Sequence, residues 1–201
     1  MLKRSFKNSK KSQLRKMRSL ELDEHHIYRL DGVVLPSVSE IMKPLTEAYY
    51  SDIDESVMET ARIRGSMVHE AIENYIHFGI YDPAAEEYVK HFIAWQEKFK
   101  PSIIMTEIMF TNGVYAGTID MYCMIGGRMV LVDLKVTSKI NRELLEVQLA
   151  AYKELLLHNG LEVEQTMVLH LKKTGWKYEQ IPVNHWKWRD LVDAFSKNKG
   201  S

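Results

Sequence analysis

The sequence predicts a mixed α/β domain in which helices flank a three-stranded antiparallel meander, and a further helix and strand follow the meander. Three observations support this fold class. Apolar residues recur at helical spacing over 57–99, and β-branched and large apolar residues fill three segments between 103 and 137. A second helical pattern over 142–158 then precedes another apolar segment, 164–172. Because 201 residues suffice for one good-sized core, we expect a single domain.

The N-terminal segment, residues 1–20, differs in charge from the rest of the chain. Residues 1–19 hold eight lysines and arginines and no acidic residue, although the net charge of the whole chain is zero. Such a block favours a solvated, flexible arm, and contact with phosphate backbones is the alternative. We therefore expect a basic arm over 1–20 and the domain over 21–201.

Composition excludes several classes of protein. No apolar run approaches the ~20 residues of a membrane span, and the basic N-terminus lacks the apolar centre of a signal peptide. The single cysteine, Cys123, cannot form a disulfide framework or a four-cysteine metal cluster within one chain. We expect a cytoplasmic protein with no membrane association.

The first half of the domain carries helix and turn signals. Asp31-Gly32 predicts a short hairpin, and Ser37 or Ser39 would cap the helix that follows it. Gly79 is placed to end a helix over 57–78. A second helix is expected to begin after Asp82-Pro83 and to end near Phe99.

Strand patterns dominate the second half. Strands are expected over 103–110, 114–125 and 128–137, with Asn112-Gly113 and Gly126-Gly127 as two-residue hairpin turns. Asn159-Gly160 would close the helix over 142–158. A strand over 164–172 is expected to pair with another over 176–183, and residues 185–197 read as a final helix.

Strand register predicts an unusual charged face. A two-residue turn at Gly126-Gly127 places Asp120 opposite Asp133, and Thr118 opposite Lys135. Residues two apart on a strand share a face, so these four side chains would lie together. The opposite face would then be apolar and belong to the core, with Ile119, Met121 and Cys123 against Leu134, Val132 and Val130.

Two carboxylates in direct opposition repel each other and need a partner. A shared proton, a lysine or a divalent cation could supply it, but the single ammonium of Lys135 cannot neutralise two carboxylates. If Asn112-Gly113 is a two-residue turn, Glu107 lies opposite Thr118 and adds a third acid; a three-residue loop would change that register. The alternative interpretation is a surface ion pair between Asp133 and Lys135 on a solvated sheet face.

The motifs together resemble the PD-(D/E)xK nuclease superfamily, and in particular its RecB-type and phage exonuclease branch. They are GTID ending at Asp120, VDLK with Asp133 and Lys135, and EVQLAAYKELL with Gln148 and Tyr152 in a Q-x-x-x-Y pattern. The helical His69 and the segment LPSVSEIMKPL also match this branch, so the resemblance covers about 33–172. One departure is that no proline precedes Asp120. The resemblance implies a restriction-endonuclease-like core with extra helices at both ends.

That resemblance also implies a Mg²⁺ or Mn²⁺ ion and no iron–sulfur cluster. Its ligands would be the side chains of His69, Asp120 and Asp133 and the backbone carbonyl of Leu134. Lys135 would stabilise charge at the phosphate, and Glu107 would support the ligands or bind a second ion. Gln148 and Tyr152 would border the active site and contact DNA.

The predicted function is metal-dependent DNA exonuclease activity in phage or prophage recombination or DNA processing. A structure-specific endonuclease resembling a junction resolvase is one alternative, and an inactive module that binds DNA or protein is another. Expected partners are DNA and a single-strand-annealing or recombination protein, and an oligomer is compatible with the sequence. Candidate phosphate contacts are Arg64, Lys139, Arg142, Lys172 and Lys173.

Overall fold

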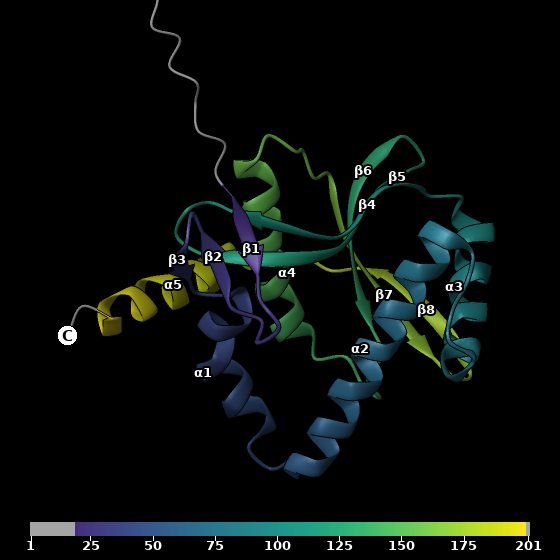
Figure 1. The fold of residues 1–201 in the computed structure, drawn as a ribbon, viewed down its shortest axis with the longest axis horizontal. Coiled ribbons are helices and arrows are strands. Elements are labelled where there is room, and N and C mark those ends of the chain that lie inside the picture. Colours follow the sequence, from purple (N-terminus) through teal and green to yellow (C-terminus); the bar gives the residue numbers. More distant parts are fainter. Residues whose placement is uncertain (1–18, 200–201) are drawn as a thin grey trace, which may run out of the picture.

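A five-stranded mixed sheet organises the computed structural model, which describes residues 19–199 (Figure 1). Most of the predicted basic arm therefore lies outside the described residues. The strands follow the order β4-β5-β6-β7-β8, and only the β6–β7 pair is parallel. Their bounds are β4 Ser102–Thr111, β5 Ala116–Ile125, β6 Arg128–Lys135, β7 Gln165–Lys172 and β8 Gly175–Gln180. The predicted meander, crossover helix and following strand are thus present.

Helices cover both faces of this sheet. One core lies beneath α1 (Val38–Tyr50), α4 (Arg142–His158) and α5 (His185–Lys199). The other lies beneath α2 (Glu55–Phe78), the short 3-10 helix η1 (Pro83–Ala85) and α3 (Glu86–Phe99). Figure 1 shows the sheet between these two groups of helices. Among residues 19–199, no helix combines the length and the apolar character that a membrane crossing requires.

Local sequence signals set the helix ends as predicted. Ser37 caps α1 by accepting a hydrogen bond from the Glu40 amide. Gly79 ends α2 in the left-handed conformation at φ 71°, and its amide donates to the Tyr75 carbonyl. The α4 bounds agree with the predicted 142–158, and Asn141 caps the helix through the Leu144 amide.

The N-terminal region forms a second, three-stranded sheet. It consists of β1 Leu20–Leu22, β2 Tyr28–Leu30 and β3 Val33–Leu35, paired antiparallel in that order. The β2–β3 turn lies at Asp31-Gly32 as predicted, whereas the sequence does not predict β1. Leu20, which falls within the expected arm, therefore belongs to the folded part of the chain. A three-residue strand is too short to show a periodic pattern, so sequence alone does not reveal it.

The predicted register of the second hairpin is confirmed from its turn to Met121–Val132, the last pair before Asp120, whereas that of the first is wrong. β5 and β6 pair Tyr122 with Leu131 and Met121 with Val132, as the Gly126-Gly127 turn requires. In the first hairpin the connection spans residues 112–115 instead of two, because the Asn112 side chain accepts hydrogen bonds from the Val114 and Tyr115 amides. Thr118 consequently pairs with Met109 instead of Glu107. The residue of β5 level with Glu107 is now Asp120, two positions further along the chain.

The single apolar face predicted for β5 is also incorrect. Met121 and Cys123 do pack beneath α2 and α3 with Val130, Val132 and Leu134. Ile119, only two residues from Met121, packs instead in the core beneath α1 and α4. The change occurs at Asp120, where β4 and β5 skip one pair of residues, and both strands bend in Figure 1.

Candidate active site

Five elements bring the predicted acidic and basic residues to the centre of the sheet. His69 comes from α2, Glu107 from β4 and Asp120 from β5, while β6 supplies Asp133, Leu134 and Lys135 and α4 supplies Gln148 and Tyr152. The gap in β4–β5 pairing lies between Thr106–Met121 and Ile108–Ile119, so Glu107 and Asp120 are the two residues freed there. The interruption of the sheet therefore coincides with the site.

Glu107 has an uncommon backbone conformation for a residue inside a strand. Its φ is 45°, in the left-handed region that L-residues other than glycine rarely occupy. Such conformations cost on the order of 1–3 kcal/mol and persist where the surroundings enforce them. Here the conformation directs the carboxylate toward α2, where Oε1 lies 3.0 Å from the Nδ1 atom of His69.

His69 connects three groups of the site. Its Nδ1 atom lies 3.0 Å from Glu107 Oε1 and 3.8 Å from Asp120 Oδ1. The other ring nitrogen, Nε2, lies 3.0 Å from the carbonyl oxygen of Leu134. Burial alone would lower the pKa of the imidazole, but the Asp120 and Glu107 carboxylates outweigh it and raise the pKa to about 9. A protonated His69 would donate to both the acid and the carbonyl.

Asp120 is tied to the neighbouring strand. Its Oδ2 atom accepts a 2.6 Å hydrogen bond from the Leu134 amide. Burial, with the Glu107 charge nearby, raises the pKa of Asp120 above its ordinary value despite the His69 and Lys135 cations. Leu134 thus offers its amide to one candidate ligand and its carbonyl to another.

Asp133 is the least solvated charge in the site, with 1% of its surface exposed. Its Oδ2 atom lies 2.7 Å from Lys135 Nζ, the distance of a charge-assisted hydrogen bond, whereas Oδ1 has no hydrogen-bond partner among the described residues. Burial and the Asp120 charge raise the pKa of Asp133. The alternative interpretation, a surface ion pair on a solvated face, is therefore wrong. A buried carboxylate with one oxygen unpaired is costly even when a single cation partly offsets its charge.

Lys135 joins the acids to the helix α4. Its ammonium donates to Gln148 Oε1 at 3.1 Å, and Gln148 Nε2 donates in turn to the Tyr152 hydroxyl at 3.2 Å. Burial would lower the pKa of Lys135, but the Asp133 and Asp120 carboxylates raise it above the ordinary value. Lys135 therefore keeps its proton and acts as a fixed positive charge.

The donor set is suited to a hard divalent cation. One ligand atom each of His69, Glu107 and Asp120 lies within 4.8 Å of the others. The Leu134 carbonyl lies 3.0 Å from His69 Nε2, whereas Asp133 is not one of these three residues and pairs with Lys135. Oxygen donors with one imidazole nitrogen fit Mg²⁺ or Mn²⁺, and the nitrogen favours Mn²⁺. Glu107 lies in direct contact with His69, a contact that strand register alone does not predict because His69 comes from α2.

The predicted phosphate contacts are dispersed. Lys139 is exposed and lines a pocket that also contains Lys135 and Gln148. Arg142 instead pairs with Glu179 of β8 at 3.1 Å, and Lys172 is exposed at the end of β7. Arg64 is half-buried, and its Nε atom has no hydrogen-bond partner among the described residues. The structure thus brings only Lys139 next to the catalytic candidates.

Two tyrosines of the site are absent from the sequence-based prediction. The Tyr28 hydroxyl lies 2.7 Å from Thr118 Oγ1, and the Glu107 charge contributes to raising its pKa after burial itself. Tyr50, at the last position of α1, lines the pocket beside Lys135. Neither lies within a recognisable motif, because their chain segments reach the site only through the packing of the N-terminal sheet and α1.

Comparisons with known proteins add two distant structural similarities. The sequence matches no protein-family model and no curated protein. The chain is similar to the crystal structure of a protein named SSO0001, at 13% identity and a TM-score of 0.36, over 76% of this chain and 82% of that one. It is also similar to a phage related exonuclease from Haemophilus somnus 129PT, at 10% identity and a TM-score of 0.38, over 79% and 88% of the two chains.

Proposed function

We propose that the protein is a divalent-metal-dependent DNA exonuclease that hydrolyses phosphodiester bonds, in phage or prophage recombination or DNA processing. The observation that carries the proposal is the cluster of His69, Glu107 and Asp120, whose ligand atoms lie within 4.8 Å of one another, next to the buried Asp133 carboxylate that pairs with Lys135 at 2.7 Å. Charged groups buried in this way reduce stability, and they are characteristic of functional sites. The motif resemblance to RecB-type and phage nucleases supplies DNA as the substrate.

The residues that would hold the cation are His69, Glu107, Asp120 and Asp133, together with the Leu134 carbonyl. When bound, the ion would supply positive charge to the phosphodiester and lower the pKa of the attacking water. Lys135, held by Asp133 and Gln148, would place a second positive charge where negative charge develops. Because its pKa is raised, Lys135 is assigned an electrostatic role and not that of a general base.

Digestion of linear and covalently closed duplex DNA tests this function directly. We expect degradation of the linear form only, with Mn²⁺ or Mg²⁺ and not with EDTA. Asp133→Ala should reduce the rate by more than about 100-fold, since even residues that merely support metal ligands contribute 10- to 100-fold. Asp193→Ala, a change of an exposed carboxylate on α5, is the matched control and should retain activity.

Two outcomes would contradict the proposal in different ways. Cutting of closed circles would replace the exonuclease with an endonuclease on the same site. Full activity of Asp133→Ala would exclude the site itself.

A further inference from the structure

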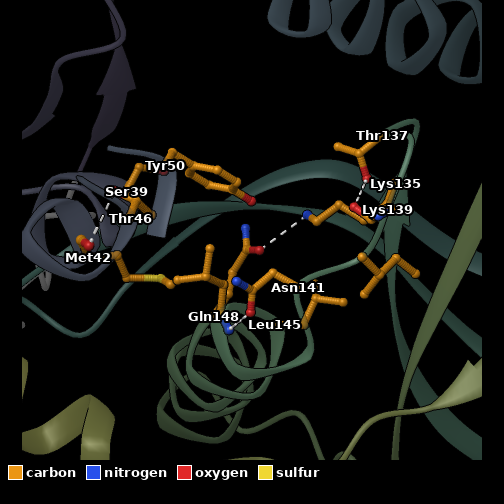
Figure 2. Close-up of a pocket in the computed structure, with 12 residues that line it drawn as sticks. Ser39, Met42, Thr46, Tyr50, Lys135, Thr137, Lys139, Asn141, Leu145 and Gln148 are labelled. Carbon is orange, nitrogen blue, oxygen red and sulfur yellow. Dashed lines mark hydrogen bonds between the residues drawn. The ribbon is translucent and has the colours of Figure 1, made fainter. Parts of the chain in front are cut away.

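A pocket next to Lys135 has the shape and charge of a nucleotide-binding site. It lies between α1 and the start of α4 and has a volume of about 230 Å³. Figure 2 shows the Tyr50 hydroxyl, the Gln148 amide and the Lys135 ammonium pointing toward the same space. We call it the Tyr50 pocket, defined by Tyr50, Lys135, Lys139, Ile140, Leu144 and Gln148, which are six of the residues that line it.

The size of the Tyr50 pocket limits what it can hold. Pockets for drug-sized ligands span about 300–1,000 Å³, so this volume suits a smaller molecule of one or two rings. Its walls combine the Tyr50 ring with apolar side chains, including Ile140 and the largely buried Leu144. A flat, partly apolar group such as a nucleobase fits such walls, and aromatic side chains stack on bases of any sequence.

The charge of the pocket selects an anion. Two lysines line it, and no aspartate or glutamate is among its lining residues in the described part of the chain. Lys139 is exposed, and no ion pair joins it to another described residue. The unpaired Lys139 ammonium at the rim matches a ligand that carries phosphate beside a base, and the Lys135 ammonium further in, although paired with Asp133, adds a donor.

The opposite side of the site has the reverse charge. A groove of about 580 Å³ there, which we call the acidic groove, is lined by Glu70, Glu73 and Glu107, and no described lysine or arginine lines it. His69 and Thr118 are also part of this groove. A polyanionic strand is therefore repelled on the α2 side of the acids and attracted on the α1 side.

We propose that the Tyr50 pocket binds the terminal nucleotide of a DNA strand, with its base against Tyr50 and its phosphate near Lys139 and Lys135. The inference rests on the proposed nuclease function, which it deepens by assigning a subsite and a direction of strand entry. The scissile phosphate then lies between the Tyr50 pocket and the cluster of His69, Glu107 and Asp120. Lys139 and Tyr50 contact substrate in this arrangement, and Gln148 positions Lys135.

Equilibrium binding in EDTA tests the pocket without catalysis. The probes are thymidine 5′-monophosphate and 2-deoxyribose 5-phosphate, which differ only by the base. We expect the wild-type protein to bind the nucleotide about tenfold more tightly than the sugar phosphate, as one base stacked on an aromatic ring predicts. Tyr50→Ala should abolish that difference, whereas Tyr50→Phe should preserve it.

Tyr49→Ala is the matched control, because Tyr49 precedes Tyr50 on α1, is 41% exposed and does not line the pocket. It should leave both affinities unchanged. Lys139→Ala, at an exposed position where folding is not at risk, should weaken both probes by a similar factor. Equal binding of the two probes by the wild type, or no detectable binding, would overturn the inference. So would an unchanged preference in Tyr50→Ala.

These results separate the pocket from the nuclease proposal. Degradation of linear DNA by a protein that does not distinguish the probes would leave the nuclease standing and remove the subsite. Base-dependent binding by a protein that degrades no DNA would retain the subsite and remove the exonuclease.

Discussion

At the scale of single residues, the site is a balance of buried charges. Asp133 and Asp120 have raised pKa values because burial penalises their ionised forms. Asp120 and Glu107 raise the pKa of His69, and Asp133 and Asp120 raise that of Lys135. The two cations do not satisfy all the acidic oxygens, since Oδ1 of Asp133 still has no hydrogen-bond partner among the described residues. The free protein therefore retains negative charge where a divalent ion would bind.

The raised pKa of His69 predicts a stability change in the metal-free protein. Folding raises this pKa from 6.5 to about 9, so the proton stabilises the fold fully below pH 6.5 and its contribution is lost as pH rises through 9. In EDTA, the free energy of unfolding should fall over this window by at most about 3 kcal/mol. Urea denaturation at pH 6, 7.5 and 9 measures it.

His69→Gln should remove that part of the pH dependence, whereas His158→Gln, at an exposed position of α4, should retain it. The pKa of Asp133 is also raised, from 3.8 to about 6, so Asp133 changes stability between those two values and below the window of His69. Equal slopes for wild type and His69→Gln above pH 6.5 would show that His69 is not held protonated by the fold.

At the scale of elements, the close approach of β5 to α4 positions the site. A Cβ atom on Gly117 would lie 2.9 Å from Tyr152 Cε1, 3.1 Å from Val38 Cγ2 and 3.4 Å from Leu155 Cδ1. Tyr152 cannot retreat freely, because its ring is buried and its hydroxyl accepts from Gln148. The glycine three residues before Asp120 thus sets how closely the α4 residues approach the acids.

Gly117→Ala should therefore destabilise the protein by about 1–3 kcal/mol through overpacking. Gly65→Ala is the matched control, because Gly65 lies within α2 and a Cβ added there would meet no atom within 4 Å beyond the adjacent backbone of its own helix. There the substitution should increase stability by roughly 0.5–1 kcal/mol through helix propensity. Thermal unfolding of the two variants compares them, and a neutral Gly117→Ala would show that Tyr152 moves aside without cost.

At the scale of the whole molecule, the candidate ligands join the two cores. His69 projects from α2 on one side of the sheet, whereas Gln148 and Tyr152 project from α4 on the other. Glu107 and Asp120 lie where β5 passes from one core to the other. A bound ion would thus link elements that are far apart in the chain, and its binding energy would add to the stability of the fold.

Mn²⁺ or Mg²⁺ should consequently raise the unfolding temperature. At 100 times the dissociation constant, a single site adds about 2.7 kcal/mol to the free energy of unfolding. Asp120→Asn should lose most of this increment, and calorimetric titration should show weaker metal binding. Asp193→Asn, at an exposed position, should behave as the wild type. Unchanged metal affinity in Asp120→Asn would contradict the paired-carboxylate site.

The sequence by itself determined the helices, the second hairpin and the shared side of Asp133 and Lys135 on β6. These features depend on local signals: capping residues, the Gly126-Gly127 turn and the period of two along a strand. Tertiary structure alone decided the direct contact of Glu107 with His69, because it depends on the longer 112–115 connection and on a left-handed backbone inside β4. Tertiary structure also decided the placement of Tyr28 and Tyr50. Both are far from the motifs along the chain, and no local sequence pattern marks them as site residues. Burial of Asp133, which is 1% exposed, likewise depends on tertiary packing, because a strand residue loses water only when other elements cover its side of the sheet.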